Sequence, residues 1–228
     1  LLSHTTGLSH HAPVGNYHDS NPHTWQEHLN SIQNTWLRFP VGTRFDYSNL
    51  NIDLAAYILE TVTNTKFQDW VGLKVLGPLN MNRTTFNYEK ATSFDNHLNG
   101  YTADGLHTIQ GIIKSPMMAS GGCFSTLEDM MKLVKFYLHR GENQEKQIVS
   151  KSLLVDEMFD IKFINAGQNG YSFGFDKRAI SEENYILSHT GSGYGFRSCM
   201  ILVPNLNLGI VLLYNSINQN LLSKLKAD

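Results

Sequence analysis

Apolar residues recur at helical spacing through the middle of the chain. Leu54, Ile58 and Val62 fall on one helical face, and Asp53 precedes them as a helix cap. The same period predicts further helices over residues 25–37, 67–75 and 127–138. Residues 125–128 match a capping box in front of the last of these helices. The pattern predicts helices interrupted by loops over about the first 170 residues.

Short β-rich runs replace the helical period in the last third of the chain. They predict strands over residues 171–175, 185–189, 198–203 and 209–214. A turn at 204–207 joins the last two strands, and residues 219–226 predict a terminal helix that packs on the sheet. Helices followed by antiparallel strands predict an α+β fold. We expect one domain, residues 1–228, with the sheet and terminal helix over about 171–228.

Composition narrows the class of protein. The chain has 228 residues, of which 41% are hydrophobic and 17% charged, so it can bury a core and is not a disordered chain. A net charge of −2 argues against nucleic acid or an anionic membrane surface as the main partner. The longest apolar runs are far shorter than the roughly 18 residues that a transmembrane span needs, so none is expected.

Cysteines and histidines give no metal pattern. Cys123 and Cys199 are too few for a disulfide framework and lack zinc-site spacing. Six of the ten histidines precede residue 40, but they do not show the helical spacing of a zinc site. We therefore expect no metal and no other cofactor. His4 is expected to make local hydrogen bonds.

Tyr47, Ser48 and Asn49 form the first candidate site, after a turn and before a helix. A tyrosine can serve as a general base only if nearby cations bring its pKa well below the usual value of about 10. An asparagine can orient a substrate amide because it both donates and accepts hydrogen bonds. Taken alone, the tripeptide also fits a half-buried tyrosine followed by a turn.

The second candidate site is the segment His189, Thr190, Gly191 and Ser192 at the end of a predicted strand. Small residues there let a substrate lie against the backbone. Backbone N–H groups at such a site can form half of an oxyanion hole. Taken alone, the segment also fits a glycine-rich hairpin.

The order of these motifs along the chain resembles one family. The matching segments are residues 1–8 (LLSHTTGL), 40–49 (PVGTRFDYSN), 121–126 (GGCFST), 189–191 (HTG) and 208–215 (LGIVLLYN), and the turn at 99–101 is similar too. Together they resemble the serine β-lactamase-like family, which includes class C β-lactamases, penicillin-binding DD-peptidases and related esterases. The resemblance implies the β-lactamase/DD-peptidase-like fold, with an antiparallel sheet beside a helical subdomain.

The resemblance also implies roles for single residues. Tyr47 would be the general base, Asn49 would hold the substrate carbonyl or amide, and His189 would occupy the cationic position of the third motif. Thr190, Gly191 and Ser192 would bind the substrate, with the Ser192 N–H in the oxyanion hole. The implied reaction is acyl transfer from an ester, amide or β-lactam carbonyl, through an acyl-enzyme on a serine.

The chain departs from the family pattern at the nucleophile. The family's Ser-x-x-Lys lies upstream of the segment that matches residues 1–8. The Ser-x-x-Lys at 223–226 falls in the predicted terminal helix, so we interpret it as chance. We expect an N-terminally incomplete chain that lacks the first strands and the nucleophile helix and is inactive without that missing segment.

Histidine at position 189 is a second departure, because β-lactamases and peptidases usually have lysine there. A histidine carries only partial charge at neutral pH, so it fits a β-lactam carboxylate less well. This favours an esterase-like or peptidase-like member acting on a small molecule or peptide with a scissile carbonyl. The alternative is a non-catalytic binding protein of the same fold, or a fragment that needs a partner segment. The family resemblance is compatible with a periplasmic or secreted protein, but no residue specifies a compartment.

Overall fold

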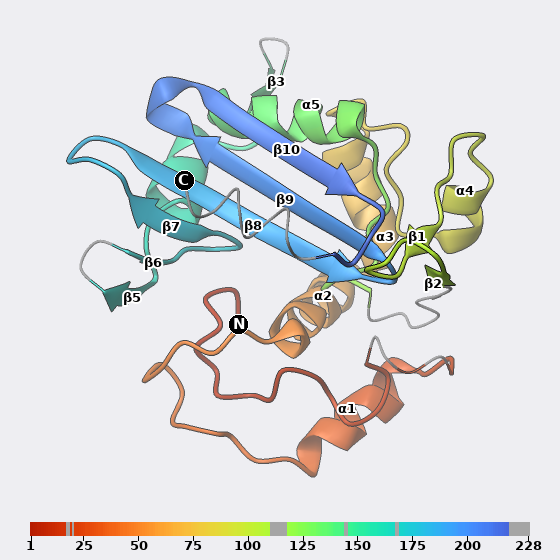
Figure 1. Ribbon diagram of the computed structural model, residues 1–228. Coiled ribbons are helices and arrows are strands. Elements are labelled where there is room, and N and C mark those ends of the chain that lie inside the picture. Colours follow the sequence, from red (N-terminus) through yellow and green to blue (C-terminus); the bar gives the residue numbers. More distant parts are fainter. Residues whose placement is uncertain (17–18, 20, 110–117, 144–145, 167–168, 219–228) are drawn as a thin grey trace.

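A six-stranded antiparallel sheet dominates the computed structural model, which describes residues 1–16, 19, 21–109, 118–143, 146–166 and 169–218. Its strand order is β10-β9-β8-β7-β6-β5 (Figure 1). The strands are β5 (Phe163–Ala166), β6 (Asn169–Tyr171), β7 (Asp176–Ala179), β8 (Tyr185–Gly193), β9 (Phe196–Val203) and β10 (Leu208–Tyr214). Every strand is therefore next to its sequence neighbour, as in a meander.

Helices come from the first two thirds of the chain. They are α1 (Trp25–Gln33), α2 (Asn49–Thr63), α3 (Phe67–Val71), α4 (Tyr88–Thr92) and α5 (Leu127–Leu138), with π-helical turns at Gly72–Leu76 and Leu153–Met158. The short strand pairs are β1 (Gly100–Tyr101) with β2 (Thr108–Ile109), and β3 (Glu142–Asn143) with β4 (Lys146–Gln147). Within the described ranges, no helix has both the length and the apolar content to cross a bilayer.

The main core lies between α5 and the sheet. Helix α5 contacts β10 and β9 and lies along β10 at the top of Figure 1. Val134 of α5, Leu187 of β8 and Leu202 of β9 are at most 1% exposed and belong to one buried cluster. Because Leu187 lies opposite Leu202 in the β8–β9 register, these two side chains point to the same face of the sheet. That face carries His189 as well, two residues after Leu187.

Helix α2 begins earlier than the sequence predicts. Ser48, not Asp53, is the N-cap, and its side chain accepts a hydrogen bond from the Asn51 N–H. The predicted apolar face is also wrong, because Ile58 is 51% exposed and Val62 is 79% exposed. Asn51 and Asp53 are buried instead, so polar contacts, described below, determine which side of α2 faces the molecule.

Further differences from the predicted elements have local causes. Residues 171–175 do not form one strand, because the Ser172 N–H donates to the Phe175 carbonyl and closes a turn between β6 and β7. Helix α1 ends at Gln33 rather than 37. The bounds of α5 are confirmed, but its cap is Thr126, whose side chain accepts a hydrogen bond from the Asp129 N–H. The Ser125 hydroxyl pairs instead with that of Thr84 at 2.8 Å.

The hairpin turn at 204–207 is confirmed as a 3-10 turn that ends in left-handed Asn207. The predicted helix at 219–226, with its Ser-x-x-Lys at 223–226, lies outside the described residues.

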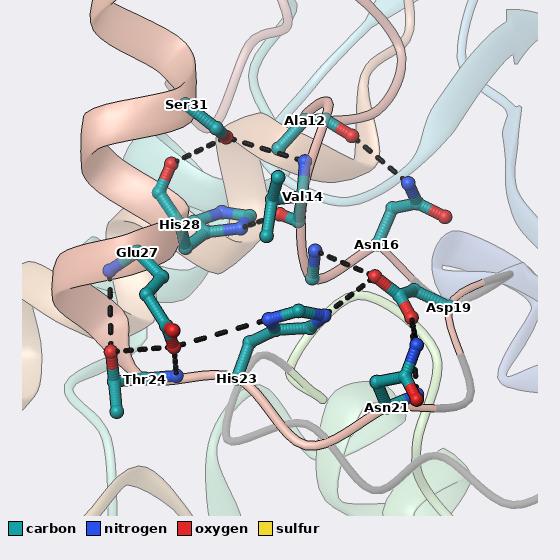
Figure 2. A network of polar contacts seen from close by, with 11 residues as sticks. Ala12, Val14, Asn16, Asp19, Asn21, His23, Thr24, Glu27, His28 and Ser31 are labelled. Atoms are coloured by element: carbon teal, nitrogen blue, oxygen red, sulfur yellow. Dashed lines mark hydrogen bonds and ion pairs between the residues drawn. The ribbon is translucent and has the colours of Figure 1, made fainter.

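Histidines near the start of the chain connect loops to α1 (Figure 2). Thr24 and Glu27 form a reciprocal capping box at the start of this helix. The His23 ring lies 2.6 Å from Asp19 and 3.9 Å from Glu27, so it joins the loop to the first helical turn. The His28 ring is buried and bonds to the Val14 carbonyl through Nδ1 at 2.8 Å. These contacts give the two histidines structural roles.

Candidate active site

Tyr47 lies immediately before the N-cap of α2, and its ring faces strand β8. The ring centroids of Tyr47 and His189 are 6.1 Å apart, with an interplanar angle of 46°. Both residues are half-buried. Two motifs that are separated by about 140 residues in the sequence therefore meet at one place, as the family resemblance implies.

Strand β8 has an unpaired edge beside this pair of rings. Strand β7 pairs with β8 only as far as Ser188, whereas β9 pairs along β8 as far as Gly193. From His189 to Gly193, the edge away from β9 has no strand partner among the described residues. Unpaired backbone N–H and C=O groups can bind an extended ligand there.

The predicted substrate-binding residues lie along this stretch of β8. Thr190 and Ser192 are exposed, and strand alternation points their side chains to the face opposite His189. Gly191 lies between them, and a Cβ there would lie 2.3 Å from the Ser198 hydroxyl oxygen on β9, so that hydroxyl would have to rotate away. What these residues offer on the His189 side is therefore backbone rather than side chains.

Asn49 is the first residue of α2 and is half-buried. It lies two residues beyond Tyr47, so the same contact that brings Tyr47 to His189 brings this end of α2 next to β8. The structure thus brings Tyr47 and the start of α2 to the β8 segment, although the two are far apart in the sequence.

Aromatic rings surround the Tyr47 phenol. His4 lies against it at a centroid distance of 4.2 Å with a tilt of 33°, and Tyr171 lies at 6.4 Å. Tyr171 also contacts His4 edge-on at 5.0 Å. Among the described residues, the Tyr47 hydroxyl has no hydrogen-bond partner.

The pKa shifts at this site do not favour a phenolate. Burial raises the pKa of Tyr47 above its usual value, and the Asp176 and Asp53 carboxylates raise it further. Burial lowers the pKa of His189, an effect that Asp176 partly offsets. The described residues therefore favour a neutral phenol beside a neutral imidazole, and the cations that would lower the Tyr47 pKa are not among them.

Asp53 is a site neighbour that sequence reasoning misread as a helix cap. Its carboxylate accepts hydrogen bonds from the N–H and the hydroxyl of Ser120, both at 3.2 Å. These bonds join α2 to the segment that continues into the predicted 121–126 motif. Burial raises the pKa of Asp53 to about 7. The partner lies 67 residues away in the sequence, so no local pattern indicates this role of Asp53.

Metal-binding geometry is not seen at this site. In the part of the chain that the structure describes, no three His, Cys, Asp or Glu side chains gather as a metal-binding group.

Comparisons with known proteins agree with this fold. A family model described as Beta-lactamase matches residues 1–223. Beta-lactamase-like protein 4 of Dictyostelium discoideum is 29% identical over 231 residues, covering 92% of this chain and 39% of the relative. The penicillin-binding protein homologue from Pyrococcus abyssi has a TM-score of 0.70 at 25% identity, covering 85% of this chain and 45% of that chain. The Beta-Lactamase/D-Alanine Carboxypeptidase from Pseudomonas syringae has a TM-score of 0.76 at 17% identity, covering 95% and 66%.

The sheet, the helices and the solved neighbours define the β-lactamase/DD-peptidase-like fold. The chain belongs to the Beta-lactamase family, a family of serine hydrolases. It spans about two fifths of the length of the curated relatives that it matches.

Proposed function

We propose that this chain forms the larger part of a serine hydrolase site that cleaves ester or amide carbonyls through an acyl-enzyme. The observation that carries the proposal is the 6.1 Å juxtaposition of the Tyr47 and His189 rings beside the unpaired edge of β8. In this proposal Tyr47 moves the proton of the nucleophile, Asn49 orients the carbonyl group, and the Ser192 N–H donates to the developing oxyanion.

The proposed nucleophile is a serine supplied by polypeptide other than the described residues. Attack by its hydroxyl on the carbonyl carbon forms the acyl-enzyme and expels the alcohol or amine, which takes up the proton. Water then attacks the acyl group and releases the acid. The proposed lysine partner of that serine would also supply the cation that the Tyr47 phenol lacks, lowering its pKa.

His189 bears on the choice of substrate. Burial lowers its pKa, so at neutral pH it offers a hydrogen bond rather than a full positive charge. A neutral donor suits an uncharged ester or amide better than a substrate that must be held by its carboxylate. We therefore propose esters and peptide-like amides ahead of β-lactams.

The test uses the full-length protein with a nitrophenyl ester and a fluorescent penicillin. We expect ester hydrolysis, and a covalent adduct with the penicillin. His189→Ala should lower kcat/KM by about tenfold or more, whereas His139→Ala, at the exposed C-terminal end of α5, should leave it unchanged. The proposal would be ruled out if correctly folded protein showed no hydrolysis and formed no adduct.

A non-catalytic binding protein of the same fold is the second candidate. The raised pKa of Tyr47 favours it, because a protonated phenol is a poor base but a good hydrogen-bond donor. The two candidates differ in one result: a binding protein would retain an extended peptide at the β8 edge reversibly, without an acyl adduct.

A further inference from the structure

His4 contacts the Tyr47 segment at three points. Its backbone carbonyl accepts a hydrogen bond from the Asp46 N–H at 2.9 Å, and its ring Nδ1 accepts one from the Ser48 N–H at 3.1 Å. The third contact is the ring stacking on Tyr47 at 4.2 Å. One residue therefore binds the backbone on both sides of the tyrosine and covers the face of its ring.

The Ser48 hydrogen bond also determines which ring nitrogen of His4 carries the proton. A backbone N–H can only donate, so Nδ1 must present its lone pair. Burial lowers the pKa of His4 to about 4, and the nearby His189 contributes to that shift. A neutral ring with Nδ1 as acceptor has its hydrogen on Nε2. That Nε2 is buried and has no hydrogen-bond partner among the described residues.

The backbone at His4 is held in an uncommon conformation. Its φ is +53°, in the left-handed region that non-glycine residues seldom adopt. The Thr6 hydroxyl donates to the Asn51 side-chain oxygen at 2.7 Å, which ties the next residues of this loop to α2. Strained residues persist where surrounding contacts hold them, and such positions concentrate at functional sites.

We propose that His4 is a positioning residue that fixes the Tyr47 phenol toward His189, as a neutral imidazole with its proton on Nε2. The inference rests on the proposed function for its effect on turnover. The expected tautomer of His4 and the expected ring geometry are independent of the proposed function.

His28 provides a matched control. It is as buried as His4, at 1% exposed, and its Nε2 also lacks a partner among the described residues. Its Nδ1, however, faces the Val14 carbonyl, so Nδ1 must carry the hydrogen (Figure 2). His28 lies on α1 against Trp25, and no contact with Tyr47 is recorded for it within the described ranges. The two histidines should therefore show opposite tautomers.

The first measurement is nitrogen-15 NMR of the ring nitrogens in the full-length protein at neutral pH. We expect a proton on Nε2 of His4 and on Nδ1 of His28. A second experiment compares nuclear Overhauser contacts between the Tyr47 and His189 rings, present in the parent protein and weakened in His4→Phe. A protonated Nδ1 at His4, or ring contacts that are unchanged in His4→Phe, would overturn the positioning role even if the protein has no hydrolase activity.

Turnover separates positioning from general destabilisation. His4→Phe keeps a ring but removes the acceptor, so we expect kcat per folded molecule to fall about 10-fold to 100-fold with KM within about twofold. His4→Asn restores an acceptor and tolerates positive φ, so it should recover most of kcat. His28→Phe should lower thermal stability while leaving kcat per folded molecule unchanged. Equal kcat values for His4→Phe and the parent contradict the proposal, whereas an inactive parent contradicts only the proposed function.

Discussion

At the scale of single residues, Tyr47 is held more firmly by its backbone than by its side chain. The Tyr47 carbonyl lies 2.9 Å from Nδ1 of His10, and the Ser48 hydroxyl donates to the Ser9 carbonyl at 2.7 Å. The phenol oxygen, in contrast, has no hydrogen-bond partner among the described residues. A hydroxyl that is positioned but unpaired can exchange a proton with an incoming group without first breaking another bond.

This arrangement gives a prediction for Tyr47→Phe. Ester turnover by the full-length protein should fall by about 10²-fold to 10⁴-fold, the usual contribution of a general acid or base. The free energy of unfolding should stay within about 0.5 kcal/mol, because no hydrogen bond to the described residues is lost. Steady-state kinetics and urea denaturation provide the two measurements.

Tyr57→Phe is the matched control for that experiment. Tyr57 lies on α2, and its ring packs on Trp25 of α1 with a centroid distance of 5.3 Å. This contact is to α1 and not to β8. It should keep full turnover. A turnover close to that of the parent in Tyr47→Phe would remove this residue from the proposed mechanism.

At the scale of elements, the buried polar residues of α2 explain why the apolar pattern mispredicted which side of this helix faces the molecule. The apolar stripe of Ile58 and Val62 is exposed, and the helix instead buries Asn51 and Asp53. Each of these polar groups has partners: Thr6 for Asn51, and Ser120 for Asp53. A buried polar side chain with good hydrogen bonds can outweigh the burial of an apolar residue, and periodicity alone does not contain that information.

The β8–β9 hairpin gives a prediction at the same scale. Its turn residues, Tyr194 and Gly195, both have positive φ, and a Cβ on Gly195 would lie 2.4 Å from the backbone carbon of Gly100. We expect Gly195→Ala to cost about 3 kcal/mol or more, since it combines backbone strain with a clash. Chemical denaturation measures this loss.

Gly174→Ala separates the two causes. Gly174 has φ of +87°, close to the +83° of Gly195, but a Cβ there meets no atom within 4 Å. Its cost should be about 1 kcal/mol, from backbone conformation alone. Equal costs for the two variants would show that the Gly100 contact contributes nothing.

At the scale of the whole molecule, two buried groups make stability depend on pH in opposite directions. The pKa of Asp53 rises from 3.8 to about 7 on folding, so the folded state holds a proton that the unfolded state has lost, and stability falls as pH rises through that window. The pKa of His4 falls from 6.5 to about 4, so stability falls as pH drops through that window.

Asp53→Asn should remove the first of these effects. Asparagine keeps an oxygen for the Ser120 N–H but does not ionise. Between pH 5 and pH 8, the parent should lose about 3 kcal/mol of unfolding free energy relative to the variant. Asp95→Asn, at an exposed carboxylate, is the control and should preserve the parent's pH dependence. Parallel curves for parent and Asp53→Asn would contradict the buried-carboxylate interpretation.

The sequence predicts much of the fold because its strong signals are local. Alternation and turn residues locate β8, β9 and β10 to within a few positions, and the α5 bounds agree with the helical period. The motifs at Tyr47 and His189 were recognisable, although only the fold could show that they meet. The roles of Asp53 and His4 depend on contacts across tens of residues, such as Asp53 with Ser120, and no local pattern encodes them.

The unpaired stretch of β8 has a consequence for handling the protein in solution. A strand edge that can accept a substrate backbone can equally accept a strand from another molecule, which is how edge-to-edge aggregation starts. Here the stretch is only five residues long, His189 to Gly193, and its exposed side chains are the polar Thr190 and Ser192. Shortness and polarity limit such pairing, so replacing these two residues with valine should promote self-association at high concentration.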